Sequence, residues 1–599
     1  MEKDTAQFQL PPHHLPLKES GKPSLSRLAH TVSHLKPRQI KGQIARRIFP
    51  FLFHPESKPS RRTPPKPELS WTSPPNLPQP TAGANSSSTI RSGKFVFINR
   101  EKQLGFPPKW NTREVDEKLW QYNLHYMDWL HSLPFEEGRQ VTRDWIAKNP
   151  AKPLAVAWEP YPTSLRVANW IIYFFARHLS KTSADDSFRE EIWLSIAHQL
   201  DHLANVIETH LLGNHLLENA VTLTLAGTCF KGWQAENWRE IGFRELRREL
   251  TEQFPEDGLH FERSPMYHLR TTYLLNLLHQ TGNQQLKELL ELPRRRCVQA
   301  LKYVTHPDGN IALFNDSAFN IYHSPRELLE QCNVADTPPT LPPSEARTEP
   351  PPPNQTGPWK LEKAGYYGFR DEHENYLICD AGAIGPDYIP GHAHCDLLSF
   401  ELSLAGHRVL VDTGTFGYGA DERRHYSRST KAHNTVEIEK ENQSDTWGTF
   451  RVGKRGYPRH VKFQPSRTGM KLEASHDGYQ RAPYYAIHRR CFSIHHPFAL
   501  SIVDRITAKR PITCRAYFHL APECTLKHST STYVMIGFEE GEFAMQFIGE
   551  GRLTSFNSEY YPEFNVALDR TSLCYEISGT NVQYECHITR NLPAQKSRE

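Results

Sequence analysis

The sequence lacks several features that would assign it to a class at once. Its charges nearly balance, with 71 Lys and Arg against 67 Asp and Glu and a net charge of +4, which argues against a dedicated nucleic-acid binder. No run approaches the ~18 apolar residues of a transmembrane helix. The first residues also lack the basic and apolar regions of a conventional signal peptide. We therefore expect no membrane span, and the location stays open between the cell envelope and the cytoplasm.

Cysteine occurs ten times, but never as a Cys-x-x-Cys pair. This spacing excludes an ordinary zinc finger or a thioredoxin-like site. Scattered single cysteines are typical of reduced, buried thiols, so we expect free thiols rather than disulfides.

Proline marks the boundaries between the parts of the chain. A chain of 599 residues is too long for one core. Residues 1–95 are rich in Pro, Ser and basic residues, which indicates a mostly flexible segment with one possible helix at 26–49. The Pro-dense stretch near 336–358 can neither continue a helix nor pair in a central strand. The predicted divisions are 1–95, a helical domain at 96–335, a linker at 336–358, a β domain at 359–592 and a tail at 593–599.

The hydrophobic period changes across this linker. Between 119 and 333, apolar residues recur every three or four positions, which predicts successive helices in a bundle, solenoid or toroid. Later segments such as 407–414 and 498–506 are short, β-branched and bounded by turns, which is typical of a β-sandwich or a layered sheet. The fold class is therefore α+β with several domains, and a ligand usually binds between such domains.

Residues 390–402, PGHAHCDLLSFEL, place two histidines two positions apart. His392 and His394 would share one face of an extended backbone. Asp412 closes the strand-like VLVD, and His433 precedes another strand. Imidazoles with one carboxylate suit a divalent metal such as zinc. Polar strand ends give the same pattern, so the spacing alone leaves both interpretations open.

The helical half offers a second polar group in LGNHLLENA, residues 212–220. Asn214, His215 and Glu218 can lie near one face of a helix. Ordinary helix capping explains an Asn and a Glu at these positions equally well. Tyr267, in FERSPMYH, is by default a core or surface residue.

Together these motifs resemble the heparinase II/III-like polysaccharide lyases. The resemblance covers most of the chain from about residue 119. It rests on LWQYNLHYMDWL (119–130), WEPYPTSLRVANW (158–170), GNHLLENA (213–220), FERSPMYH (261–268), PGHAHCDLLSFEL (390–402), VLVDTGTFGYG (409–419) and RSTKAHNTVEI (428–438). HLKPRQIKGQI (34–44) also resembles the start of some members, so the N-terminal helix is expected to belong to the fold.

The resemblance implies an N-terminal (α/α) toroid followed by a C-terminal antiparallel β-sandwich, with an acidic, uronic-acid-containing polysaccharide between them. The implied catalytic residues are Asn214, His215, Glu218, Tyr267, His392 and, as a second tyrosine, Tyr426. The implied metal ligands are His394, Asp412 and His433. The metal, expected to be zinc, would steady the loop of His392 rather than activate water.

The implied activity is cleavage by β-elimination. A C5 uronyl epimerase begins with the same proton abstraction, and a binding or assembly protein or a zinc hydrolase are further alternatives. The expected partner is an acidic polysaccharide and no nucleic acid, with the chain as a monomer or a homodimer. Arginines that could recognise carboxylates or sulfates are Arg263, Arg423, Arg424, Arg428 and Arg489.

Overall fold

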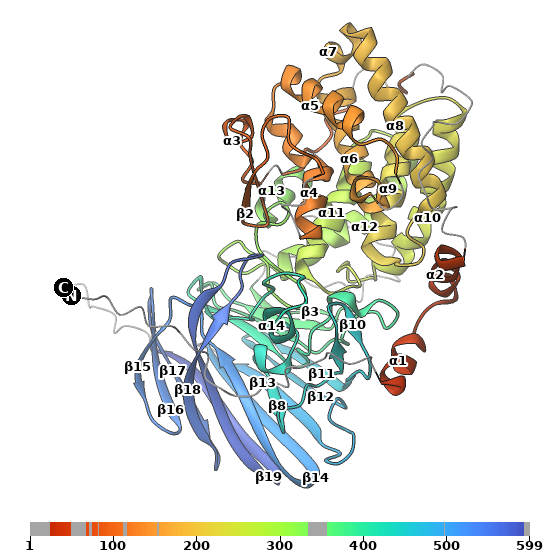
Figure 1. Ribbon diagram of the computed structural model, residues 1–599. Helices are drawn as coiled ribbons and strands as arrows, with labels where there is room; N and C mark the ends of the chain where they lie inside the picture. Colours follow the sequence, from red (N-terminus) through yellow and green to blue (C-terminus); the bar gives the residue numbers. More distant parts are fainter. Residues whose placement is uncertain are drawn as a thin grey trace, which may run out of the picture.

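The computed structural model describes residues 24–48, 68–70, 75–81, 83–111, 117–152, 155–332, 356–495 and 498–591. Helices fill the first half and strands the second, with the helical part above the β part in Figure 1. The α-helices are α1 (Leu25–Val32), α2 (Pro37–Ile48), α3 (Ser87–Arg91), α4 (Lys118–Tyr126), α5 (Phe135–Lys148), α6 (Pro160–Trp170), α7 (Leu179–Ala184), α8 (Asp186–Val206), α9 (Gly213–Cys229), α10 (Trp233–Gln253), α11 (Pro265–His279), α12 (Gln284–Tyr303), α13 (Pro325–Cys332) and α14 (Glu422–Ser427).

The helices differ in how much of their surface is buried, which separates interior helices from outer ones. In α9 every residue except His215 is buried, and α11 is buried from Pro265 to Leu278. A helix that is buried all round belongs to the interior of a domain. By contrast, α5 and α12 bury one face and expose the other. The interior helices α9 and α11 carry the predicted site residues of the helical half.

The β domain contains two antiparallel sheets. A five-stranded sheet has the order β3 (Gly357–Leu361), β4 (Tyr366–Arg370), β5 (Tyr376–Asp380), β6 (Phe400–Leu404) and β7 (His407–Leu410). A ten-stranded sheet contains β8 (Val436–Ile438), β11 (Pro458–Ser466), β12 (Gly469–His476), β13 (Ile487–His495), β14 (Ala499–His519), β15 (Thr525–Ser529), β16 (Tyr533–Phe538), β17 (Gly541–Ile548), β18 (Arg552–Tyr560) and β19 (Leu568–Asn591). Two-stranded pairs join β1 (Lys94–Phe97) to β2 (Arg100–Gln103) and β9 (Thr446–Trp447) to β10 (Arg451–Val452).

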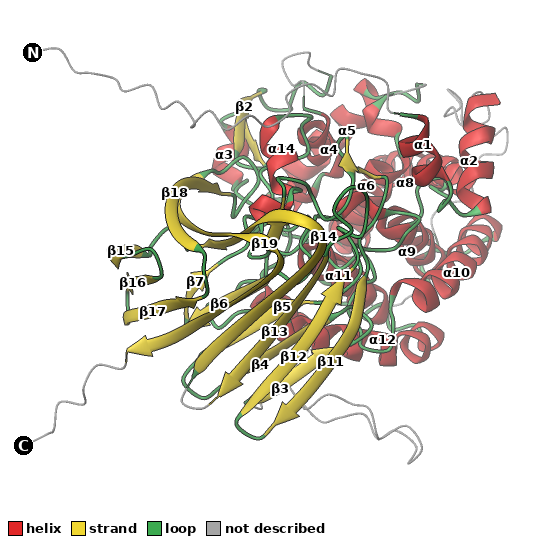
Figure 2. Ribbon diagram, turned by 90° about the horizontal axis from the view of Figure 1, so that it is seen from below, coloured by secondary structure: helices red, strands yellow, loops and turns green. Residues whose placement is uncertain are grey.

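The five-stranded sheet lies between the large sheet and the helices. Phe400 of this sheet packs against Phe492 of the large sheet, with ring centroids 5.6 Å apart. On its other face Trp359 stacks on Tyr303 of α12 at 5.1 Å. Because side chains alternate along a strand, one sheet serves two cores. Seen from below, the strands lie in front of the helical part (Figure 2). The predicted helical toroid followed by a β-sandwich is confirmed.

The N-terminal segment forms two helices where one was expected. α1 and α2 are separated before Pro37, since a residue that precedes proline avoids the helical conformation. The predicted linker falls largely outside the described residues, and β3 begins at Gly357. No helix in the described ranges is long and apolar enough to cross a membrane. All ten cysteines are free and buried, as expected.

Candidate active site

A carboxylate from a neighbouring loop holds the start of α9. Leu212 and Gly213 have φ values of 67° and 60°, so the chain turns sharply before the helix. A Cβ on Gly213 would collide with Glu262 Oε1, so glycine is required for this close approach. Glu262 accepts hydrogen bonds from the Asn214 backbone at 2.8 Å and from Asn214 Nδ2 at 3.1 and 2.9 Å. Asn214 is therefore not a helix cap, but a buried amide oriented by Glu262.

His215 is the one residue of α9 that is not fully buried, and it pairs with Glu208. Its Nδ1 lies 3.1 Å from Glu208 Oε1, and its ring lies 4.4 Å from that of Tyr161. Burial alone would lower the pKa of His215, but Glu208 outweighs it and the net pKa is raised. The imidazole is thus held in place and favoured in its charged form.

Glu218 forms an ion pair within the helical domain. Both of its oxygens accept hydrogen bonds from Arg270, at 3.0 and 2.8 Å, and its side chain is 1% exposed. A carboxylate that neutralises a buried guanidinium is not free to carry a proton. The structure places Glu218 in a buried ion pair, and the catalytic role that the resemblance implied stays a prediction.

Tyr267 lies at the start of α11, directly against the β domain. Ser264 caps this helix by accepting a hydrogen bond from the Tyr267 backbone N–H. The Tyr267 ring lies 4.0 Å from the ring of His392, and its hydroxyl shares a 2.9 Å hydrogen bond with the hydroxyl of Tyr418. Burial raises the pKa of Tyr267 well above its usual range, and Tyr418 raises it further. The phenol is therefore a neutral proton donor next to the imidazole.

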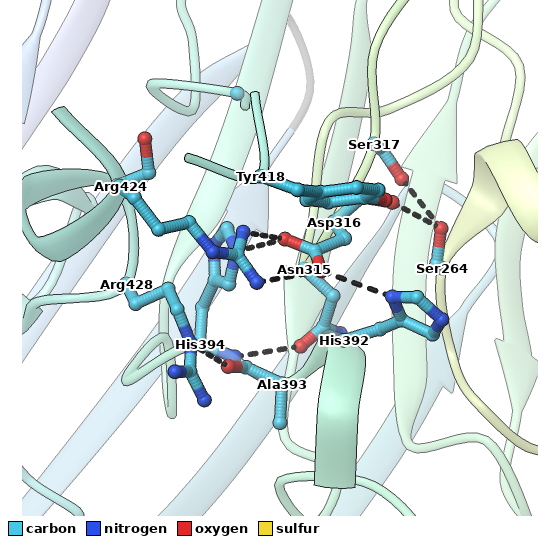
Figure 3. Close-up of polar contacts among 12 residues, drawn as sticks. Ser264, Asn315, Asp316, Ser317, His392, Ala393, His394, Tyr418, Arg424 and Arg428 are labelled. Carbon is cyan, nitrogen blue, oxygen red and sulfur yellow. Dashed lines mark hydrogen bonds and ion pairs between the residues drawn. The ribbon is translucent and has the colours of Figure 1, made fainter. Parts of the chain in front are cut away.

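One buried carboxylate, Asp316, binds both histidines of PGHAHCDLLSFEL (Figure 3). Asp316 Oδ2 accepts from His392 Nδ1 at 3.0 Å, and Oδ1 accepts from His394 Nε2 at 2.9 Å. Arg424 donates to both oxygens, one of them at 2.9 Å. Although burial would raise the pKa of Asp316, Arg424 and the two histidines hold it well below its usual range. We call Asp316, Arg424, His392 and His394 the Asp316 cluster.

The Asp316 cluster was missed in the sequence analysis. Asp316 lies 76 residues from His392 and 108 from Arg424, so no local spacing joins them. The predicted extended backbone also differs from the structure, because Pro390–His392 forms a 3₁₀ turn. The histidines meet through their shared carboxylate rather than through strand alternation. The available signal was a charged Asp within FNDS, which follows the apolar segment IALF.

The three predicted metal ligands, His394, Asp412 and His433, are all fully buried. His433 Nδ1 donates to Asp412 Oδ2 at 2.7 Å, and the rings of His394 and His433 lie 5.4 Å apart. His394 Nδ1 and His433 Nε2 are buried without a hydrogen-bond partner. Burial lowers the pKa of His394 to about 3, which keeps its imidazole neutral. Within the described residues, no group of three or more His, Cys, Asp or Glu side chains is placed to hold a metal.

Tyr426 does not join the cluster around Tyr267. Its hydroxyl is buried without a hydrogen-bond partner, and its ring lies 6.3 Å from that of Tyr561. The second tyrosine of this site is Tyr418, whose ring lies 6.2 Å from that of His392. The catalytic role that the resemblance implied for Tyr426 stays a prediction.

The arginines expected to recognise substrate are bound within the protein. Arg424 binds Asp316, and Arg428 donates to four backbone carbonyls. Arg263 also donates to backbone carbonyls. Arg423 pairs with Glu559 at 2.7 Å. Their roles in this structure are to fix loops around the site.

Comparisons with known proteins agree with this architecture. Residues 95–331 match the heparinase II/III N-terminus, and residues 353–589 match the heparinase II/III-like C-terminal domain. A heparin-sulfate lyase of Pedobacter heparinus is 25% identical over 374 residues, covering 56% of this chain and 54% of the relative. One from Bacteroides thetaiotaomicron is 25% identical over 378 residues, covering 54% and 51%. The chain spans about half the length of these curated relatives.

Solved structures support the same fold over nearly the whole chain. A heparinase III structure superposes with a TM-score of 0.68 at 18% identity, covering 95% of this chain and 94% of that one. A mutant heparan sulfate lyase from Pedobacter heparinus gives 0.60 at 18% identity, covering 93% and 87%. With both of its halves matched in order, the chain belongs to the heparinase II/III-like family.

Proposed function

We propose that this protein is a polysaccharide lyase that cleaves a uronic-acid-containing polymer of the glycosaminoglycan class by β-elimination. The observation that carries the proposal is the Tyr267–His392 pair, in which a phenol from the helical domain and an imidazole from the β domain lie 4.0 Å apart. The names of the curated relatives, heparin-sulfate lyases, support the substrate class.

The pair supplies the two proton transfers that β-elimination needs. A base removes the C5 proton, its electrons form the C4–C5 double bond, and O4 leaves with a new proton. Because His392 Nδ1 donates to Asp316, Nε2 is the nitrogen that can act as the base; it lies 3.3 Å from Glu262 Oε2 at the boundary between the two domains. Tyr267, kept neutral by its raised pKa, donates the proton to O4. Such positioned proton transfer is worth about 10²–10⁴-fold in rate.

The uronate carboxylate must be neutralised before the C5 proton becomes acidic enough to remove. His215 is the candidate, because Glu208 raises its pKa and favours the imidazolium. Asn214, fixed by Glu262, lies 3.5 Å from His392 Nε2 and so adds an amide beside the base.

We also propose a divalent metal, with zinc the best match, held by His394, His433 and Asp412. The three side chains do not form a complete ligand set as they lie in this structure, but two buried imidazole nitrogens have no hydrogen-bond partner, and zinc binds imidazole and carboxylate together. When bound, the metal would fix the loop that carries His392. The proton transfers belong to the side chains of this chain.

The test is incubation of the purified protein with heparan sulfate, chondroitin, hyaluronan and alginate in D₂O. New ultraviolet absorbance from a C4–C5 double bond supports the lyase. Deuterium at C5 without chain cleavage would instead show an epimerase, saturated products a hydrolase, and binding without either change an assembly protein. Tyr267→Phe, prepared in parallel, should lose the absorbance and excludes a contaminating lyase.

A further inference from the structure

The two N-terminal helices lie across both domains. α2 packs beside α10 of the helical domain, and α1 lies next to the β domain (Figure 1). The matched family segments begin only at residue 95. We call residues 25–48 the strap, and its contacts indicate what it does.

The α1 end of the strap is anchored to the β domain. Arg27 donates to both oxygens of Asp445, at 3.0 and 2.7 Å. Trp447 Nε1 donates to Thr31 Oγ1 at 3.2 Å, and that hydroxyl lies 3.3 Å from the Val452 carbonyl. A bidentate ion pair with added side-chain bonds fixes both position and orientation.

The α2 end is anchored to the helical domain. Arg38 pairs with Glu245 of α10 at 2.7 Å, and Lys36 pairs with Glu252 of the same helix. Lys36 also lies 4.0 Å from the centre of the Tyr388 ring, while the Tyr388 hydroxyl donates to Glu252. The strap therefore reaches α10 and the loop before His392 together.

Gln39 is the residue at which these contacts converge. It is 3% exposed, and its Oε1 accepts from the Lys36 backbone N–H at 2.9 Å. Its Nε2 donates to the Tyr388 carbonyl at 3.0 Å and to the Leu211 carbonyl at 3.4 Å. Every hydrogen-bonding atom of this amide is thus used, and the two acceptors belong to different domains.

The two carbonyls belong to the segments that enter the active site. Leu211 comes three residues before Asn214, across the sharp turn at Leu212. Tyr388 comes four residues before His392, across the turn at Pro390–His392. Only one short turn separates each carbonyl from its site residue, so a shift of the carbonyl would also move the side chain of Asn214 or His392.

We propose that Gln39 is a positioning residue that fixes how the helical half and the β half of the active site are placed relative to each other. The assignment rests on the proposed function for its catalytic consequence, but not for its structural one. A displacement of about 1 Å between reacting groups can cost about 10²-fold in rate. Loss of the Gln39 amide therefore acts on kcat, without removing any group that touches substrate.

The experiment compares Gln39→Ala, Gln39→Glu and the matched control Gln43→Ala in the full chain. Gln43 lies on the same helix, is exposed, and donates to the His210 carbonyl of the helical domain at 3.4 Å. Gln39→Glu keeps the acceptor for Lys36 but turns the donor into an acceptor that faces two carbonyls. We expect kcat to fall by about 10- to 100-fold in Gln39→Ala and further in Gln39→Glu, with KM changed less than about threefold. Gln43→Ala should match the wild type.

Amide hydrogen exchange provides the second measurement, and it needs no substrate. Exchange should rise in both 208–213 and 385–391 in Gln39→Ala. In Gln43→Ala, which loses a contact to His210, exchange in 385–391 should stay at the wild-type level. Unchanged exchange in both segments would overturn the proposal, as would a loss of activity explained entirely by a lower folded fraction. If the wild type cleaves no polymer, the proposed function fails while the exchange result still decides the role of Gln39.

Discussion

Asp316→Asn separates what this carboxylate does for folding from what it does for catalysis. The substitution removes the charge that pairs with Arg424, a side chain that is 1% exposed. Leaving a buried ion without its partner costs about 3–5 kcal/mol of the free energy of unfolding. The amide also stops fixing the His392 tautomer through Nδ1, and loss of such an orienting carboxylate lowers kcat by up to about 10⁴-fold.

The double variant Asp316→Asn with Arg424→Gln isolates the catalytic part. Without the unpaired guanidinium, we expect at least half of the lost stability to return, as measured by urea denaturation. The kcat for double-bond formation should stay at the level of the single variant, because His392 still lacks its acceptor. Recovery of stability and kcat together would refute the reasoning, since Asp316 would then act only through the fold.

Three further predictions follow from the site. Tyr267→Phe should lower kcat by at least about 10²-fold, while the lost hydrogen bond to Tyr418 lowers the free energy of unfolding by only about 1–3 kcal/mol because the ring is kept; a wild-type rate would contradict the acid role. The purified protein should contain close to one zinc per chain by elemental analysis, and His433→Ala should lose it; equal zinc contents would count against the proposed ligand. Glu208→Gln should destabilise the protein more at pH 5.5 than at pH 9. The raised pKa of His215 gives stability that is full below its unfolded pKa and lost as the pH rises through the folded value, so equal losses in urea melts at both pH values would contradict the pairing.

The fold was predictable because its signals are local and repeated. The apolar residues of 214–230 recur so often that the segment had to be a buried helix, and α9 occupies Gly213–Cys229. In the same way, the β-branched run near 498–506 falls within β14. The break between α1 and α2 was less visible, since one proline within a helical pattern permits either a kink or an end.

The location of site residues was predictable only where they belong to a motif that carries the family resemblance. Asn214, His215, Tyr267 and His392 lie near the domain boundary as the resemblance implied. The sequence analysis named Tyr426 and did not consider Tyr418, because the path of the loop into α14 decides which hydroxyl meets Tyr267. Ligand roles for the buried histidines stay a prediction, since their spacing does not determine which nitrogen is left free.

Sequence reasoning did not predict which groups bind each other across the boundary between the two domains. Asp316 of the helical half is neutralised by Arg424 of the β half, and Gln39 binds carbonyls of both. Undocking the domains would break this ion pair and let water hydrate both groups, so the net gain from the pair is much smaller than its direct attraction. Its main effect is on geometry, because the domains can bury both groups only in the docking position that pairs them. Hence the carboxylate that orients His392 also joins the two halves of the molecule.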